Sequence, residues 1–249
     1  MNLKYSIPFS YMMNSIPPNL VLYADDAILV INKPAGMLSL QDGYDKTLPH
    51  ITTVLSPTYG RIWMIHRLDR ETSGVMVVAR SAQAHQALNG QFKDRQVQKI
   101  YHCLAWGSPD WAEKNLEVRL KKDGDRQHRS TIDPRGKPST TFFRVLERYP
   151  GISLIEASPH TGYTHQIRAH LAYLGFPLVG DDLYRDPHRP TSLVDEGQPK
   201  PGGIDRVALH ALSIQFIHPL THTSMAFSAP YPEDFSLAVQ QLRSGVKPH

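Results

Sequence analysis

The sequence of 249 residues contains a single cysteine, Cys103, and no long uninterrupted run of apolar residues. One cysteine excludes an intramolecular disulfide and any zinc site built from several cysteines. No stretch approaches the roughly 18 apolar residues that a membrane-spanning helix needs. Residues 1–18 also lack the basic and apolar regions of a secretory signal peptide. We therefore expect a cytoplasmic protein in a reducing environment, with no membrane partner.

The signature motifs of four enzyme classes are missing as well. The chain has no P-loop, no G-x-G-x-x-G fingerprint, no G-x-S-x-G elbow and no P-C-x-x-C deaminase motif. His165 and His170 are five residues apart rather than the four of an H-E-x-x-H metal helix, so we expect no metal there. A metal-dependent phosphoesterase that uses the histidines with Asp181 and Asp182 remains an alternative, and it would lose activity on chelation.

A mild positive charge is spread unevenly along the chain. The net charge is +4, from 27 Lys and Arg against 23 Asp and Glu. Residues 119–148 alone hold nine Lys and Arg against four acids, a surplus of five. Such a segment, which we expect to be rich in loops, can neutralise the phosphates of a nucleic acid. The alternative is a charged loop that contacts only solvent.

Strand patterns outnumber helix patterns, and hairpins recur. This order predicts an α+β fold with a mostly antiparallel sheet, in one domain or in one domain of two lobes around a cleft. We expect a lead-in at residues 1–20, a catalytic domain at 21–243, and a long Pro/Gly-rich loop at 184–204. The expected strands are residues 27–32, 61–68, 74–79, 99–106, 140–148, 152–157, 209–217 and 224–229, and the expected helices are 48–55, 81–92, 164–174 and 232–243.

The densest polar segment is residues 65–74 (IHRLDRETSG), where Asp69 lies between two arginines. Flanking cations favour the ionised carboxylate. A charged carboxylate at the end of a strand is suited to nucleophilic or basic work at a sugar carbon. The alternative is a turn in which the Asp69 side chain bonds the backbone of Glu71 or Thr72.

A second segment, residues 160–171 (HTGYTHQIRAHL), predicts a helix capped by Thr164. Ile167 and Leu171 share its core face. Arg168, at the border of that face, is placed to hold a carboxylate bidentately, although an exposed arginine on a polar face is the alternative.

Tyr101 lies on the strand predicted for residues 99–106. An aromatic side chain there can stack on an extracted base, and such stacking contributes on the order of 1–3 kcal/mol. A core tyrosine whose hydroxyl is satisfied is the alternative.

Taken together, these segments resemble the RluA family of pseudouridine synthases. Residues 66–74 look like its catalytic motif, and Asp69 falls on its essential aspartate. The resemblance runs in order from about residue 28 to residue 230. It is carried further by residues 31–36 (INKPAG), 99–101 (KIY), 161–171 with Gly180 and Asp181, 209–211 (LHA) and 218–220 (HPL).

The resemblance implies the pseudouridine synthase fold: a mostly antiparallel mixed sheet in two lobes around a central catalytic cleft. It implies that Asp69, Tyr101 and Arg168 are catalytic, with Arg168 paired to the aspartate. It also implies isomerisation of uridine to pseudouridine in a flipped-out nucleotide, without cofactor or metal. Asp69 would attack C1′ or remove the C2′ proton, and the two routes stay open. Expected contacts with the RNA substrate come from His66, Arg67, Arg70, Thr72, Lys121, Lys122, Arg126, His165 and Leu209.

One residue departs from the family pattern. Tyr163 stands where the family usually has arginine, so a phosphate contact is either absent or replaced by stacking. The roughly twenty lead-in residues are too few for an S4 RNA-binding domain, and the layout is most similar to the short branch that acts on 23S rRNA and a tRNA anticodon loop. We expect a monomer. A catalytically silent RNA-binding protein that uses the same cleft is the leading alternative.

Overall fold

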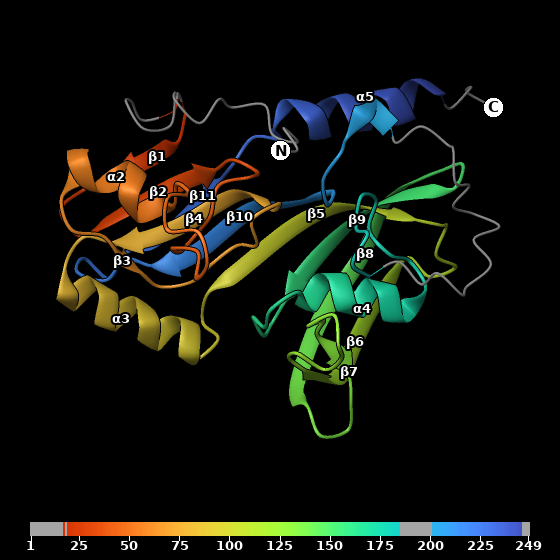
Figure 1. The fold of residues 1–249 in the computed structure, drawn as a ribbon, viewed down its shortest axis with the longest axis horizontal. Helices are drawn as coiled ribbons and strands as arrows, with labels where there is room; N and C mark the ends of the chain where they lie inside the picture. Colours follow the sequence, from red (N-terminus) through yellow and green to blue (C-terminus); the bar gives the residue numbers. More distant parts are fainter. Residues whose placement is uncertain (1–16, 18, 185–200, 246–249) are drawn as a thin grey trace. The chain divides into compact units, whose positions relative to one another are not determined.

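The computed structural model describes residue 17, residues 19–184 and residues 201–245 (Figure 1). These residues form two compact units, each built from two separate stretches of chain. The first unit contains the described residues up to Lys99 together with Ala211–Pro230, and the second contains Ile100–His210 and the described residues from Tyr231 onward. Most of the expected lead-in and most of the expected 184–204 loop lie outside the described residues. The predicted domain boundaries stay predictions.

The first unit is a mostly antiparallel sheet in the order β1-β2-β4-β10, in which β11 also pairs with β10 and β3 with β4. The central strands β2 and β4 are apolar almost throughout, and they are buried along nearly their whole length. Both faces of these strands are therefore covered, which explains their continuous rather than alternating apolar pattern. The strands are β1 (Val21–Ala24), β2 (Ile28–Lys33), β3 (Trp63–Met64), β4 (Ser73–Ala79), β10 (Leu209–Ile217) and β11 (Ser224–Ser228).

Two helices complete the first unit. The helix α3 (Ala82–Lys93) begins where expected, because the Ser81 hydroxyl accepts a hydrogen bond from the Ala84 N–H at 3.2 Å. The helix α2 (Ile51–Tyr59) begins three residues later than expected. Pro49 explains this, since a residue before proline is disfavoured in the helical conformation.

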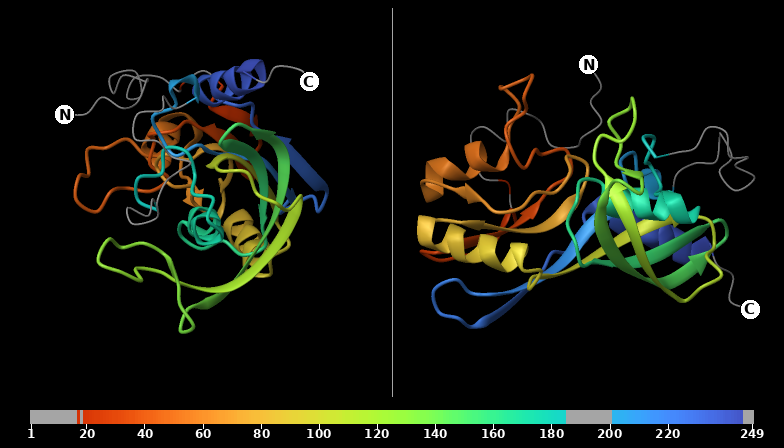
Figure 2. Two further views of the ribbon diagram at one scale, coloured as in Figure 1. Left: turned by 90° about the vertical axis from the view of Figure 1, so that its right-hand side faces the viewer. Right: turned by 90° about the horizontal axis from the view of Figure 1, so that it is seen from below.

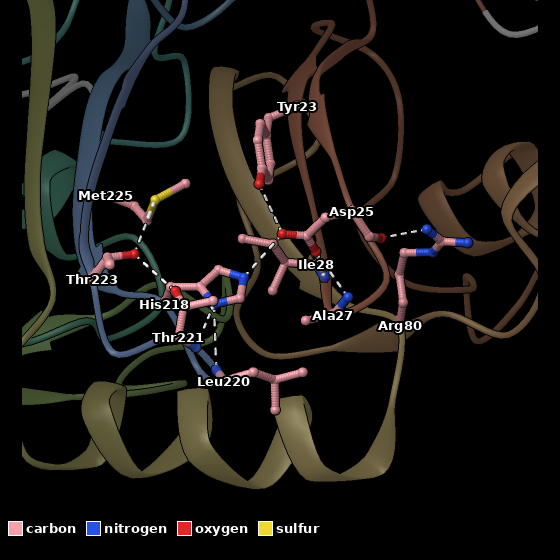
Figure 3. A network of polar contacts seen from close by, with 10 residues as sticks. All are labelled: Tyr23, Asp25, Ala27, Ile28, Arg80, His218, Leu220, Thr221, Thr223 and Met225. Atoms are coloured by element: carbon pink, nitrogen blue, oxygen red, sulfur yellow. Dashed lines mark hydrogen bonds and ion pairs between the residues drawn. The ribbon is translucent and has the colours of Figure 1, made fainter.

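An aspartate network ties β1, β2 and the β10–β11 turn together within the first unit (Figure 3). The Asp25 carboxylate accepts hydrogen bonds from the Ala27 and Ile28 N–H groups, both at 2.8 Å. His218 lies 2.9 Å away through Nε2, while its Nδ1 accepts the Thr221 N–H at 3.0 Å. Because Nδ1 accepts, Nε2 carries the proton and donates to Asp25. Burial raises the pKa of Asp25, but hydrogen bonds from Ile28 and its other partners outweigh burial and leave the pKa lowered.

The second unit is an antiparallel sheet in the order β5-β9-β8-β6-β7. Strands β8 and β9 form the hairpin expected around residues 149–151, with Tyr149 opposite Ile152. The strands are β5 (Gln98–Trp106), β6 (Glu113–Lys121), β7 (Thr131–Ile132), β8 (Lys137–Tyr149) and β9 (Ile152–Pro159).

Alternation along β5 separates two of the hydrophobic clusters in the second unit. Cys103 and Ala105 pack in a cluster with Ile167 of α4 (Gln166–Leu174). Leu104, between them, packs in another cluster with Phe235 of α5 (Glu233–Gly245). Successive side chains of a strand point to opposite faces, so each helix covers one face of β5.

The α+β class and the mostly antiparallel sheet are confirmed. Three expectations about elements were wrong. The strand expected at residues 61–68 is only two residues long, β1 was not foreseen, and the basic segment 119–148 is largely strand rather than loop. Among the residues described, no helix has the length and apolarity to cross a membrane.

Candidate active site

Asp69 lies in a tight turn that joins β3 to β4. The Thr72 N–H donates to the main-chain carbonyl oxygen of Asp69 at 3.1 Å, so the bond that closes the turn does not use the carboxylate. Leu68 and Thr72 are buried, while Asp69 is half-buried and Arg67 is exposed. The turn is thus anchored by buried side chains on both sides of the half-buried Asp69.

The backbone on each side of Asp69 is held by residues 33–39. On one side, the Ser39 hydroxyl donates to the Leu68 carbonyl at 2.7 Å and accepts the Leu68 N–H at 3.0 Å. On the other side, the Gly36 N–H donates to the Arg70 carbonyl at 2.8 Å, and Arg70 Nε donates back to the Gly36 carbonyl at 3.2 Å. We call these paired contacts the two clamps. They fix the peptides before and after Asp69.

A buried lysine supports the second clamp. Lys33, at the end of β2, has no exposed surface. Its Nζ donates to the carbonyl oxygens of Pro34 at 3.0 Å, Met37 at 2.9 Å and Arg70 at 3.2 Å. A buried ammonium group needs such partners, because burial without hydrogen bonds is costly. Lys33 thus joins the 33–39 segment to the Asp69 turn, a role the sequence pattern had not assigned to it.

The turn must be followed by glycine. Gly74 has φ +116°, and a Cβ atom there would lie 2.2 Å from the carbonyl oxygen of Ala211 in β10. Any other residue would therefore push β10 away from β4. This explains the glycine that closes the 66–74 segment.

His66 is tied to the interior of the first unit. Its Nε2 accepts the Val77 N–H at 3.1 Å, and its ring stacks on Phe92 at 4.6 Å between centroids. Burial, and then the charge of Lys99, lower the pKa of His66 to about 3, so the ring is neutral at physiological pH. The expected RNA contact of His66 stays a prediction.

In the second unit, a glutamine network sets the start of α4. The Gln166 side chain donates to the Thr140 carbonyl at 3.0 Å and accepts from the Thr161 hydroxyl at 2.8 Å. The N-cap residue is His165, in the left-handed conformation with φ 54° and without a side-chain capping bond, and not Thr164 as expected. Gly175 ends the helix as predicted, with φ 92°.

Arg168 is buried and makes a bidentate ion pair. Its Nε and Nη2 donate to the two carboxylate oxygens of Asp181, each at 2.7 Å. The guanidinium also lies 5.1 Å from the ring centroid of Tyr184, whose N–H donates to Asp181 at 3.2 Å. The alternative of an exposed arginine is therefore wrong. The pairing of Arg168 with Asp69 stays a prediction.

Breaking this pair is expected to destabilise the fold. In Asp181→Asn the shape is kept, but a buried guanidinium loses its charged partner, which typically costs about 3–5 kcal/mol. Urea denaturation followed by circular dichroism measures the loss. Asp182→Asn is the matched control, because the neighbouring side chain is exposed and such surface changes stay within about 0.5 kcal/mol. Equal losses in the two variants would contradict the assignment.

Tyr101 and Leu209 belong to one packed region of the second unit. Leu209 is part of the cluster that includes Ile167 of α4, and Tyr101 packs against the same cluster. Tyr101 is only half-buried and lies opposite Ala157 in the β5–β9 pairing. The structure thus brings these two predicted site residues together on the side of β5 covered by α4.

The predicted cationic contacts lie at the end of β6, where Lys121 is the last residue, and on the β6–β7 connection. Lys122 and Arg126 are exposed, whereas Lys121 is half-exposed and lies 3.8 Å from Asp133. Asp125 orders this connection by accepting the Gln127 N–H at 3.0 Å and Arg129 Nε at 2.6 Å. Lys122 and Arg126 are therefore presented by an ordered turn, directly after Lys121 at the end of β6.

The predicted site residues fall into two groups. Asp69 lies in the first unit with His66, Arg67, Arg70 and Thr72, and the remaining predicted residues lie in the second unit.

No group of three His, Cys, Asp or Glu side chains that could hold a metal ion occurs in the part of the chain that the structure describes. The phosphoesterase alternative is weakened by a separate observation: both carboxylate oxygens of Asp181 are bonded to Arg168. Tyr163 packs half-buried against the cluster of Leu120, Ala169 and Tyr184, which accounts for its aromatic ring.

Solved structures support the fold. Human RNA pseudouridylate synthase domain containing 4 has a TM-score of 0.73 at 22% identity, with 94% of this chain and 95% of that chain covered. Human RNA pseudouridylate synthase domain containing 1 has a TM-score of 0.69 at 26% identity, with 95% and 99% covered.

Sequence comparisons go further. Residues 27–173 match the family model described as RNA pseudouridylate synthase. Ribosomal large subunit pseudouridine synthase C of Vibrio vulnificus is 36% identical over 228 residues, covering 91% of this chain and 70% of that protein. Its Escherichia coli counterpart is 37% identical over 232 residues, with the same coverage. The clamped aspartate turn lies inside the matched region, and the chain belongs to the RNA pseudouridylate synthase family.

Proposed function

We propose that this chain isomerises uridine to pseudouridine in large-subunit ribosomal RNA, with Asp69 as the essential carboxylate. The observation that carries the proposal is the family match over residues 27–173, which contains the clamped Asp69 turn. Relatives named ribosomal large subunit pseudouridine synthases, at 36–37% identity, support the choice of RNA.

The proposed reaction requires only correctly positioned side chains from the protein. The N1–C1′ glycosidic bond breaks, the uracil turns, and a C5–C1′ bond forms, while the C5 hydrogen leaves as a proton and N1 takes up a proton. There is no net oxidation or reduction and no atoms are gained, so the proposal includes no cofactor or metal. Asp69 acts on the ribose by attack at C1′ or by removal of the C2′ proton. The two clamps support either role, because they remove conformational freedom before the substrate binds.

A stacked or paired uridine is inaccessible, so the nucleotide must be flipped out at a cost of a few kcal/mol. In the proposal, the exposed Arg67 occupies the space that the base leaves in the RNA. Tyr101 stacks on the everted uracil, and Leu209 closes the pocket beside it. Their common packing cluster supports a shared role. Loop substrates lower the flipping cost, which favours hairpin loops as targets.

Arg168 orients the Asp69 carboxylate in this proposal. Asp181 fixes the orientation of the guanidinium through Nε and Nη2. A guanidinium carries five N–H donors in a planar fork, which makes arginine well suited to hold carboxylates. Arg168→Met should reduce turnover much more than RNA affinity, and equal losses in both would make Arg168 a simple RNA contact.

Neutralising the β6–β7 turn should weaken RNA binding in a salt-dependent way. The triple variant Lys121→Gln, Lys122→Gln, Arg126→Gln removes three exposed or half-exposed cations. Each phosphate contact on single-stranded RNA contributes about 0.7 to the slope of log K against log salt. We expect the slope to fall by about 2 in filter-binding assays between 50 and 200 mM salt.

A second triple variant provides the control for this prediction. Lys93→Gln, Arg95→Gln and Lys114→Gln remove the same charge at exposed positions outside the site. Its slope should stay near the wild-type value. If the two triple variants behave alike, the β6–β7 turn is only a charged solvent-exposed segment.

The substrate is tested by mapping pseudouridines in cellular RNA with and without the gene. Loss of one or more sites in large-subunit ribosomal RNA is the expected result. Loss of sites in tRNA loops alone would contradict the choice of ribosomal RNA while leaving the chemistry intact. The proposal places the enzyme in the cytoplasm as a monomer, with the RNA as its partner.

A further inference from the structure

The loop between β2 and α2 is closed at its base and fixed beside the Asp69 turn. The Ile51 N–H donates to the Leu38 carbonyl at 3.0 Å, which joins the two ends of residues 39–50. Ser39, at the start of the loop, forms the first clamp on Leu68. Figure 2 shows this loop, in dark orange, standing out from the body of its own unit in both views.

Two aspartates give the tip of the loop a defined shape. Asp42 Oδ1 accepts the N–H groups of Tyr44 at 2.8 Å and Asp45 at 2.9 Å. Asp45 Oδ1 then accepts the Thr47 N–H at 2.9 Å. Side chains that bond the backbone two or three residues on are typical of ordered turns. The tip is therefore organised without help from hydrophobic packing.

This organised tip presents an aromatic ring to solvent. Tyr44 is fully exposed, at 102% of its reference surface. This exposed fraction is greater than that of any other large hydrophobic side chain among the described residues. Tyrosine usually buries its ring, so full exposure on a fixed turn points to a ring that becomes covered on binding. Lys46, two residues on, is exposed as well.

The base of the loop places it beside the Asp69 turn, because Ser39 bonds Leu68, the residue before Asp69. Hydrogen bonds from Asp45 and Tyr44, and to a lesser degree the charge of Arg70, lower the pKa of Asp42. Asp42 therefore stays ionised while it holds the backbone of the tip, and Lys46 is the cation that the tip offers to a phosphate. Exposed aromatic and cationic groups together are the usual means of holding unpaired RNA.

We propose that the 39–50 loop is an RNA-binding element, in which Tyr44 stacks on an unpaired base next to the target uridine and Lys46 contacts a phosphate. The inference rests on the proposed function, because it takes RNA as the substrate. It adds a contact outside the catalytic group and assigns it to residues that neither sequence patterns nor the family motifs had singled out. The loop thereby selects uridines whose neighbours are also unpaired.

The test measures affinity and chemistry separately. Wild type, Tyr44→Ala, Tyr44→Phe and Lys46→Gln are compared by filter binding to an unmodified transcript of large-subunit ribosomal RNA. Single-turnover tritium release from C5-labelled transcript at saturating enzyme gives the rate of the bound complex. Tyr173→Ala is the matched control, since Tyr173 is exposed on α4 and belongs to no proposed contact.

Tyr44→Ala should weaken binding about 5- to 150-fold, the effect of losing one base stack. Tyr44→Phe, which keeps the ring, should bind within about twofold of wild type, as should Tyr173→Ala. Lys46→Gln should lower the salt slope by about 0.7. The single-turnover rate at saturation should stay unchanged in all four variants.

Several results would overturn the inference. Tyr44→Ala binding as tightly as wild type would remove the loop from the interface, and equal losses in Tyr44→Ala and Tyr44→Phe would exclude stacking. A lower single-turnover rate of Tyr44→Ala at saturating enzyme, with unchanged affinity, would make Tyr44 part of the chemistry instead of the RNA-binding surface. An inactive wild-type enzyme on every RNA would instead contradict the proposed function, whatever the loop variants bind.

Discussion

Asp69→Asn is expected to abolish pseudouridine formation while leaving RNA affinity within a few-fold of wild type. The substitution keeps the size of the side chain but removes its charge, so it can neither attack C1′ nor take the C2′ proton. Loss of a general base alone costs roughly 10²- to 10⁴-fold in rate, and loss of a nucleophile costs at least as much. Tritium release from C5-labelled RNA reports the change, since the C5 hydrogen leaves only when the new bond forms.

The comparison with Asp26→Asn makes this result specific. Asp26 is an exposed aspartate of the same unit, so its loss changes the net charge equally without touching the turn. Turnover by Asp26→Asn should match wild type. Substantial tritium release by Asp69→Asn would remove this carboxylate from the reaction, and the alternative of a silent RNA-binding protein predicts no release even by wild type.

Lys33→Met should produce a clear loss of stability. Methionine fills a similar volume, but it leaves the carbonyl oxygens of Pro34, Met37 and Arg70 without the Nζ that now reaches them at 2.9–3.2 Å. The Arg70 carbonyl keeps the Gly36 N–H, whereas each buried acceptor left unsatisfied costs about 1–3 kcal/mol. The free energy of unfolding, measured by urea denaturation, should therefore fall by at least about 1 kcal/mol.

Catalysis should suffer beyond this loss of stability. One of the three carbonyls belongs to Arg70, so the clamp that follows Asp69 weakens. The folded fraction of Lys33→Met, counted by RNA-binding stoichiometry, should turn over more slowly than wild type. Lys93→Met is the control, because the same substitution is made at an exposed lysine near the end of α3. If both variants keep wild-type stability, Lys33 does not support the turn.

Local signals predicted the elements that local chemistry determines. Ser81 predicted the start of α3, Gly175 predicted the end of α4, and residues 149–151 predicted the hairpin. These predictions succeeded because caps and turns depend on residues that are neighbours in sequence. The strand β6 was missed because its residues alternate between charged and apolar within a segment whose overall charge was its strongest feature. Position in a sheet, rather than composition, makes such a segment a strand.

The proposed catalytic residue of the site could be predicted from the sequence, but most of the contacts that hold its backbone in place could not. Asp69 between two arginines was recognisable, and the resemblance gave it a role. No local sequence pattern showed that Lys33 would be buried or that Ser39 would bond Leu68. The Ser39–Leu68 contact spans 29 positions of the sequence, and the contact between Lys33 and Arg70 spans 37. The glycine and proline after Lys33 were the only hints of a loop that must fit closely against another backbone.

The order in which the chain is synthesised does not match the order in which its units are completed. The first unit lacks Ala211–Pro230 until the second has almost been made, and the second lacks α5 until the end. During translation one edge of β4 therefore stays unpaired until β10 has been synthesised, and exposed strand edges promote aggregation. Folding of this protein is expected to be late and slow, because its decisive pairings join the most widely separated stretches of the polypeptide.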